Sequence, residues 1–276
     1  MRVLLGLIVV LIPIFAMAES PARIEEVKKD DDGVIHLFNG KDLTNFYTYL
    51  AAPYKEKQAL GKNNDPKKVF TVVDGAIRIS GEVFGGLITE RDYGDYRLIV
   101  EYKWGEKTFM PRVNNARDSG ILIHCSGEDG SAGGAWMPAV ECQMIEGGTG
   151  DFILIGNKDH PRRLTAEIET RGGQPYYKPG GTVREFTGGR INWYARDPQW
   201  KDVKGFRGEH DLEKPAGEWN RYEIISDGDT ITAILNGKTT AMGTKCNVTK
   251  GKILFQSEAA EVYFRRIDLR PLASKK

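Results

Sequence analysis

Two neighbouring runs of the sequence decide how this chain folds: "SGILIHCSG" at residues 119–127 and "MPAVECQMIEGGTGDF" at residues 137–152. Both runs are rich in the apolar and β-branched residues that favour strands. Successive side chains of a strand point to opposite faces of a sheet. In the first run, one face therefore carries Ile121, Ile123 and Cys125, and the other carries Leu122 and His124.

The second run has the same alternation. Val140, Cys142 and Met144 share one face, and Glu141 and Gln143 share the opposite one. If the two strands are neighbours in a sheet, their apolar faces fill a core between two sheets. The histidine of the first run then joins the glutamate and glutamine of the second on the solvent-facing side. This pattern predicts a polar cluster on one concave sheet face.

Glu146 needs a separate explanation, because it lies five residues after Glu141 and an unbroken strand would point it into the core. A buried carboxylate without a partner is costly. A β-bulge between Gln143 and Glu146 would return it to the polar face, and bulges are frequent beside active sites. Alternatively, the strand ends at Ile145 and Glu146 begins a loop. In both cases we expect Glu146 to converge with the cluster.

Period-two alternation recurs through the rest of the chain, for example in "YRLIVEYKW" at residues 96–104. Asp74-Gly75 and Asn236-Gly237 are dipeptides that accept the backbone angles of tight hairpin turns. Many short strands separated by glycine-containing turns are typical of a sandwich or jelly roll. The sequence therefore predicts an all-β fold.

Three segments have weaker strand patterns. Residues 51–60 and 164–169 are candidates for short helices, because their pattern is the nearest to helical that the chain offers. The glycine- and proline-rich stretch at residues 172–189 reads as a long loop. Long ordered loops often line binding sites on β-sandwiches.

The first eighteen residues, "MRVLLGLIVVLIPIFAMA", have the order of a secretory signal: a basic residue, an apolar run and an Ala-x-Ala site. Pro13 interrupts the run, which is shorter than the ~20 apolar residues of a membrane span. Residues 19–33 are charged and read as a flexible leader, and residues 34–276 as a single domain. We expect a periplasmic or secreted protein, with no membrane contact once the signal is cleaved.

Charge and cysteine content narrow the classes of partner. The chain has 39 basic and 38 acidic side chains, and removing the signal, which holds Arg2 alone among them, balances the two. This balance argues against nucleic acid as a partner, and nothing in the sequence indicates an oligomeric state. Cys125, Cys142 and Cys246 have no metal-site spacing. They read either as three small buried groups or as a Cys125–Cys142 disulfide and one free thiol.

Several stretches, in order along the chain, resemble the 3-keto-disaccharide hydrolase domain family. They are "LFNGKDLTNF", "GGLITERDYGDYRLIVEYKW", "DSGILIHCSG", "ECQMIEGGTGDF", "KPAGEWNRYEI" and "ILFQSEAAEVYFRRIDLRPL", which together run from about residue 35 to residue 272. The resemblance implies a concanavalin-like jelly roll of two curved antiparallel sheets. It also implies a carbohydrate substrate that is a 3-keto-glycoside.

Cleavage of such a substrate needs a base for the C2 proton, a group that stabilises the enolate oxygen, and an acid for the leaving group. Candidates for this set are His124, Glu141 and Glu146, and the spacing does not assign their roles. No cofactor is indicated with certainty. The same three side chains could instead hold a divalent cation that polarises the ketone, so the metal content stays open.

A second and more distant similarity links "ECQMIE" to the E-x-D-x-x-E signature of retaining β-glucanases with the same architecture. In those enzymes the first glutamate is the nucleophile and the last is the acid/base. Gln143 replaces the aspartate here, and an amide cannot tune a nucleophile as a carboxylate does. A β-glucanase-like hydrolase is therefore the alternative enzyme. A non-catalytic carbohydrate-binding module is the other alternative.

Residues expected to bind substrate surround this set. Gln143 shares its face, Arg117 and Asp118 precede the first strand, and Asp151 follows the loop after Glu146. Tryptophans in loop-like stretches offer indole rings on which a sugar could stack. The candidates are Trp136, Trp193 and Trp200.

Overall fold

The computed structural model describes residues 32–273, and within them every regular element is a β-strand. The predicted all-β class is confirmed. The predicted secretory signal at residues 1–18 and all but the end of the predicted leader at residues 19–33 lie outside the described residues.

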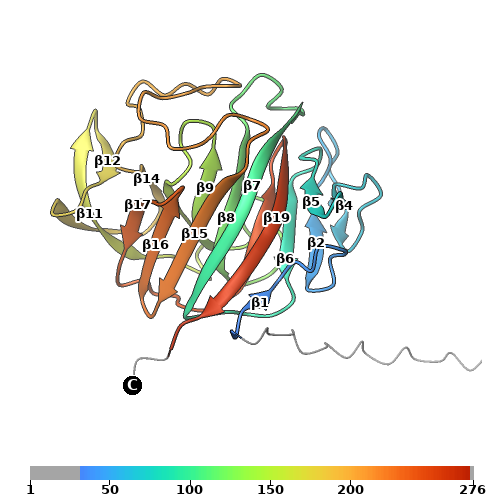
Figure 1. Cartoon of the computed structure of the whole chain (residues 1–276), viewed down its shortest axis with the longest axis horizontal. Coiled ribbons are helices and arrows are strands. Elements are labelled where there is room, and N and C mark those ends of the chain that lie inside the picture. The colour runs from blue at the N-terminus through green and yellow to red at the C-terminus, as the bar shows by residue number, and fades with distance from the viewer. Residues whose placement is uncertain (1–31, 274–276) are drawn as a thin grey trace, which may run out of the picture.

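The strands form two antiparallel sheets of eight strands packed as layers, so the fold is the predicted jelly-roll sandwich (Figure 1). The first sheet has the order β17 (Lys238–Gly243), β16 (Thr230–Leu235), β15 (Asn220–Asp227), β7 (Tyr96–Thr108), β19 (Ala260–Pro271), β5 (Ala76–Ile79) and β4 (Phe70–Val73), with β1 (Ile35–His36) paired to β19.

The second sheet lies behind the first in Figure 1. Its order is β14 (Gly189–Ile191), β10 (Phe152–Ile155), β9 (Ala139–Ile145), β8 (Asp118–Cys125), β18 (Lys252–Ser257), β6 (Gly85–Thr89), β2 (Phe46–Leu50) and β3 (Gly61–Lys62). A small third sheet contains β12 (Gln174–Tyr177), β11 (Leu164–Arg171) and β13 (Thr182–Phe186).

The main core fills the space between the two large sheets, because each strand turns one apolar face inward. From the second sheet, the inward side chains include the predicted Ile121, Ile123, Val140, Cys142 and Met144, all of which are buried. Burial of each such side chain contributes about 1.5–3 kcal/mol, and this free energy decides which face of each strand points into the core.

Two hairpins form where the sequence predicts them. Val73 pairs with Ala76 and Leu235 pairs with Lys238, which leaves Asp74-Gly75 and Asn236-Gly237 as the two-residue turns. All four turn residues have positive φ angles, between 48° and 83°. These are the angles that a type I′ turn demands and that Asn, Asp and Gly tolerate best.

Three expectations for local structure were wrong. Residues 51–60 form turns and loop, and residues 164–169 lie in β11, so neither is a helix. β11 is a strand because it pairs on both sides, with β12 and β13. The stretch at residues 172–189 contains those two partner strands and is not one long loop.

The three cysteines are free and buried, so the Cys125–Cys142 disulfide does not form.

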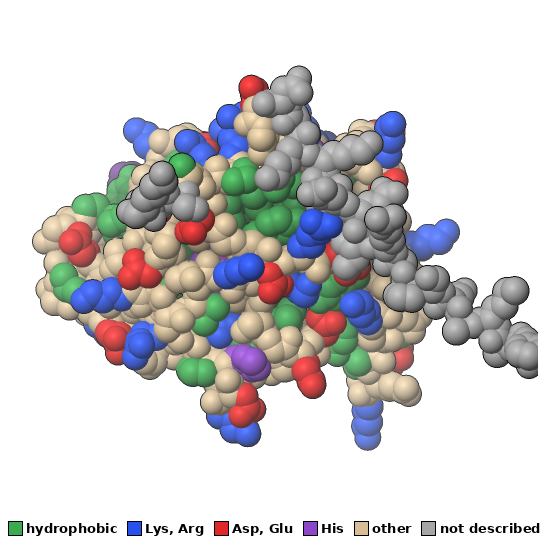
Figure 2. Space-filling model, turned by 90° about the horizontal axis from the view of Figure 1, so that it is seen from below, with side chains coloured by type: hydrophobic (Ala, Val, Ile, Leu, Met, Phe, Trp, Pro, Cys, Tyr) green, Lys and Arg blue, Asp and Glu red, His purple; other side chains and the backbone are tan. Residues whose placement is uncertain are grey.

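The molecular surface agrees with the balanced charge of the sequence. Figure 2 shows basic and acidic side chains interspersed over one face of the molecule, without a patch of a single sign. No helix among residues 32–273 is long and apolar enough to cross a membrane.

Candidate active site

Polar side chains gather on the outer face of the second sheet, the face that points away from the main core. Strand pairing sets Gln143 opposite Gly120, and Gln256 opposite Gly86. Gly120 and Gln256 lie on adjacent strands, so the polar side chains and glycines alternate across β9, β8, β18 and β6. The predicted outward direction of Gln143, and of Glu141 two residues before it, is confirmed.

Glu141 and Gln256 meet above Gly120, where the absence of a side chain leaves them room. A Cβ atom on Gly120 would lie 2.3 Å from Glu141 Oε1 and 2.6 Å from Gln256 Oε1. Burial raises the pKa of Glu141 to about 8, and the negative charge of Asp118 adds to this rise. A hydrogen bond from Gln256 acts in the opposite direction. Glu141 is therefore largely protonated at neutral pH.

Two more carboxyl groups complete what we call the carboxyl cluster: Asp118, Glu141 and Glu258. Asp118 pairs with Glu258 across a β-bridge, and Gln143 Nε2 donates to Asp118 Oδ1 at 3.0 Å. Burial raises the pKa of Asp118, and burial together with the charges of Asp118 and Glu141 raises that of Glu258. Since three neighbouring carboxylates repel one another, the cluster retains protons near neutral pH.

Two arginines border the carboxyl cluster, and each is held by a second acid. Arg112 Nη2 lies 3.0 Å from Asp118 Oδ2 and 3.0 Å from Asp202 Oδ1. Arg190 Nη1 lies 2.6 Å from Asp151 Oδ2, and its charge acts on both Glu141 and Asp118. Asp151 holds one nitrogen of the Arg190 guanidinium. The remaining N–H groups of that guanidinium can donate to a bound molecule, and its positive charge lies beside the cluster.

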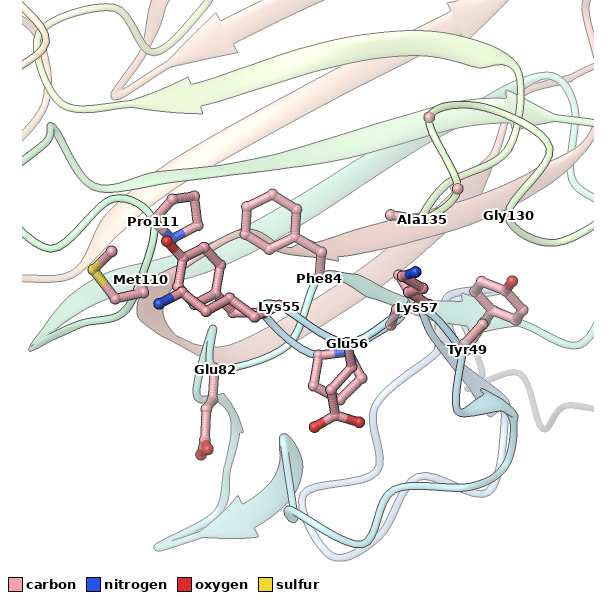
Figure 3. A pocket seen from close by; sticks show the side chains of 17 residues that line it. Tyr49, Lys55, Glu56, Lys57, Glu82, Phe84, Met110, Pro111, Gly130 and Ala135 are labelled. Atoms are coloured by element: carbon pink, nitrogen blue, oxygen red, sulfur yellow. The ribbon is translucent and has the colours of Figure 1, made fainter.

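A pocket of about 570 Å³ is lined by residues in and next to the paired strands β2 and β6 of the second sheet (Figure 3). Phe84 lines it and directly precedes Gly85, which pairs with Ser257, the residue before Glu258. Met110 and Pro111, which lead into Arg112, also line the pocket. The next pair in that antiparallel register would be Glu258 and Phe84, so the partly buried Glu258 is the member of the cluster nearest to the pocket in the pairing.

His124 does not join the cluster, and its predicted direction was wrong. Its φ angle is 55°, and the pairing between β8 and β18 shifts register beside it, so a bulge reverses the alternation. The ring points into the main core, where Nε2 lies 2.9 Å from Ser226 Oγ, and burial lowers its pKa to about 4. Cys125, predicted to lie in the main core, packs with Leu122 on the outer face instead.

Glu146 also lies apart from Glu141. β9 ends at Ile145, which is the second of the two predicted alternatives, and Glu146 begins the turn that follows. Its side chain forms a buried ion pair of 2.5 Å with Arg117 and accepts a hydrogen bond of 2.8 Å from the backbone of Gly205. The predicted convergence of His124, Glu141 and Glu146, as an acid/base set or as ligands of one cation, is therefore not present.

The other residues expected to bind substrate have structural contacts. Arg117 is committed to Glu146. Asp151 is fully buried, pairs with Arg190 and Arg196, and accepts a hydrogen bond of 2.8 Å from the backbone of Trp193. Trp193 is itself buried, with only 2% of its surface exposed, so it cannot stack on a sugar from solvent.

Trp136 and Trp200 are each partly buried. Trp136 stacks on Phe84, with ring centroids 6.0 Å apart, and so forms the second layer of the pocket wall. Trp200 donates a hydrogen bond of 2.8 Å to the backbone oxygen of Glu146 and lies over Arg196. Of the predicted tryptophans, Trp136 is the one that the structure brings to the pocket.

Sequence reasoning missed Gln256, Glu258, Arg112 and Arg190. Gln256 and Glu258 alternate with Phe255 in "ILFQSE", so the same period-two reading could have placed them on an outer face.

Among residues 32–273, no group of three or more His, Cys, Asp or Glu side chains is arranged to hold a metal ion.

The raised pKa of Glu141 predicts a pH-dependent stability. A carboxyl group whose pKa is about 8 when folded and about 4.5 when unfolded favours the folded state below pH 4.5, and this contribution is lost as the pH rises through 8. Glu141→Gln should therefore make the free energy of unfolding, measured by urea titration, less dependent on pH between 5 and 9. Glu128→Gln, at an exposed position, is the matched control and should change nothing. Parallel pH profiles for wild type and Glu141→Gln would contradict the assignment.

Several solved structures are similar to this chain. A candidate glycosyl hydrolase from Parabacteroides distasonis is 18% identical, with 90% of this chain and 99% of that chain covered and a TM-score of 0.50. A second structure of that description from the same organism is 20% identical over 87% and 99%, with a TM-score of 0.47. A Bacillus licheniformis β-glucanase is 11% identical over 87% and 97%, with a TM-score of 0.42. Among curated proteins, no sequence matches.

A family model supplies the assignment that these distant structures do not. The model of the 3-keto-alpha-glucoside-1,2-lyase-like domain matches residues 33–270, which includes every strand of both large sheets except the last residue of β19. This is the family that the sequence resembles, and the match indicates a protein that acts on carbohydrate. The chain therefore belongs to the 3-keto-alpha-glucoside-1,2-lyase-like domain family.

Proposed function

We propose that the protein cleaves 3-keto-glycosides at C1, by removal of the C2 proton and loss of the C1 substituent. The observation that carries the proposal is the carboxyl cluster on the outer face of the second sheet, where burial raises all three pKa values and the charge of Asp118 adds to the rise at Glu141 and Glu258. Groups with pKa values near the working pH are the ones suited to give and take protons. The secretory signal predicted at residues 1–18 would place this reaction in the periplasm or outside the cell.

The reaction needs one carboxylate and one carboxylic acid at the same time. A ketone at C3 acidifies the C2 hydrogen, so the carboxylate removes that proton and the electron pair forms the C2–C3 enolate. The enolate then expels the C1 oxygen, which takes a proton from the carboxylic acid. Addition of water to the resulting C1–C2 double bond completes the hydrolysis, with the oxygen at C1 and a proton at C2.

The roles follow from the two environments in the cluster. Asp118 is next to Arg112, which favours its ionised form, so Asp118 is the proposed base. Glu141, with a pKa of about 8, is the proposed acid. Arg190 acts on both carboxyl groups, and it is the cation that would stabilise the oxygen of the enolate.

The β-glucanase alternative has less support from the site. A nucleophilic glutamate must be ionised, whereas burial keeps Glu141 largely protonated at neutral pH. The last glutamate of the E-x-Q-x-x-E pattern, Glu146, is committed to Arg117 and Gly205. The pattern in the sequence therefore does not correspond to a pair of carboxyl groups that face one substrate.

A mass-spectrometric assay of products tests the proposal. The purified protein is incubated with 3-keto-glucosides in both anomers and, in parallel, with the same glucosides before oxidation. We expect release of the C1 substituent from the 3-keto-glucosides and none from the unoxidised glucosides, because only the ketone acidifies C2. Equal release from both would contradict the proposal. Binding of either sugar without release would favour a carbohydrate-binding module.

A further inference from the structure

The pocket at strands β2 and β6 has a flat aromatic wall. The rings of Phe84 and Trp136 stack with an interplanar angle of 24°. Trp136 Nε1 donates to the backbone oxygen of Gly85 at 3.1 Å, which fixes the plane of the indole behind Phe84. A rigid ring supported from behind is a surface on which another flat ring can stack.

Apolar side chains at the pocket rim are exposed to solvent. Tyr54 is 47% exposed and Met110 is 48% exposed, although both line the pocket. Large apolar side chains that gather around a hollow are a mark of a ligand site, because a bound molecule removes them from water. The volume of about 570 Å³ is within the range of small-molecule sites.

One positive charge at the pocket has no neighbouring carboxylate to balance it among the described residues. Lys57 lines the pocket, and within residues 32–273 it has no carboxylate partner. Glu82 is neutralised by Lys67 at 2.7 Å. Figure 3 shows the carboxyl groups of Glu56 and Glu82 directed away from Phe84. A ligand on the aromatic wall would therefore meet a free ammonium group rather than a carboxylate.

We propose that this pocket binds the leaving group of the reaction, and that the preferred leaving group is an aromatic aglycone with an anionic substituent. This inference rests on the proposed function, since it places the sugar ring over the carboxyl cluster and its C1 substituent past Glu258 against Phe84. The aromatic ring of the aglycone stacks on Phe84. The anionic substituent faces Lys57.

Ratios of kcat/KM between variants test the proposal, because the intrinsic reactivity of each leaving group cancels when two enzymes act on the same substrate. The substrates are the 4-carboxyphenyl, 4-carbamoylphenyl and methyl 3-keto-glucosides. Phe84→Leu should lower kcat/KM for both aryl substrates about tenfold and leave the methyl substrate within about twofold. Lys57→Gln should lower it about tenfold for the carboxyphenyl substrate alone.

Lys41→Gln is the matched control for charge, because Lys41 is exposed and does not line the pocket. It should leave all three values unchanged. If Phe84→Leu and Lys57→Gln affect the methyl and aryl substrates equally, the proposal is overturned while the proposed function stands.

Calorimetry separates this inference from the proposed function, since binding needs no turnover. Unoxidised 4-carboxyphenyl glucoside should bind the wild-type protein, and Lys57→Gln should weaken that binding about tenfold. This result without turnover of any 3-keto-glucoside would remove the proposed reaction but retain the pocket as an aryl-glycoside site. Absence of binding to wild type overturns the pocket inference.

Discussion

Glu141→Gln is expected to lower kcat/KM on a 3-keto-glycoside by about 10²–10⁴-fold, the range that proton transfer by a positioned side chain typically contributes. Glutamine keeps the shape of Glu141 above Gly120 but cannot give up a proton to a leaving group. Because the shape is conserved, the fold should persist, and circular dichroism with urea unfolding checks this. The measurement is the initial rate of product release over a range of substrate concentrations.

Glu146→Gln is the control that separates this account from the β-glucanase alternative. Glu146 pairs with Arg117 and lies outside the carboxyl cluster, so the substitution should reduce stability. At a temperature where the variant is folded, its turnover should stay within about threefold of wild type. A loss as large as that of Glu141→Gln would show that Glu146 takes part in the chemistry.

Asp151→Ala is expected to lower the free energy of unfolding by about 3–5 kcal/mol, the usual effect of breaking a buried ion pair from one side. Asp151 has no exposed surface and neutralises two guanidinium groups, those of Arg190 and Arg196. Its removal leaves both cations without their partner and the backbone amide of Trp193 without its acceptor. Equilibrium unfolding in urea measures the change.

Asp159→Ala provides the comparison for that experiment. Asp159 pairs with Lys158 at 3.1 Å, but both side chains are exposed, so the pair should contribute less than about 1 kcal/mol. Similar losses of stability for Asp151→Ala and Asp159→Ala would contradict the structural role assigned to Asp151.

Strand alternation predicted most of the sheet facing correctly because burial leaves little choice of register. A strand shifted by one residue would place Cys142 and Met144 in solvent and Glu141 in the core. The same rule failed at His124, since it assumes an unbroken strand. The φ angle of 55° at His124 is one that residues other than glycine rarely adopt, so the sequence carried no signal for the bulge.

The candidate site was harder to predict than the fold because its members come from distant segments. Asp118 and Glu258 are neighbours in space but lie 140 positions apart in the sequence, and only the order of strands in the sheet brings β8 beside β18. Arg190 arrives from β14, which begins at the last residue of the stretch that reads as a loop. No local pattern specifies such contacts.

Glu146 shows the opposite error, in which a local pattern suggested a contact that does not form. Its spacing from Glu141 matches a known signature, yet the turn after Ile145 directs it towards Arg117 and Gly205. The local spacing was satisfied, but β9 ends at Ile145 without the bulge that would have turned Glu146 to the outer face.

The origin of the C2 hydrogen in the product tests the central claim most directly. With a 3-keto-glycoside in D₂O, the account predicts that the released 3-keto-sugar carries deuterium at C2, since the C2 proton is removed and replaced from solvent. Released sugar incubated without enzyme measures spontaneous exchange and is subtracted. Product without deuterium at C2, together with cleavage of an unoxidised glucan with retention through a covalent Glu141 intermediate, would contradict it.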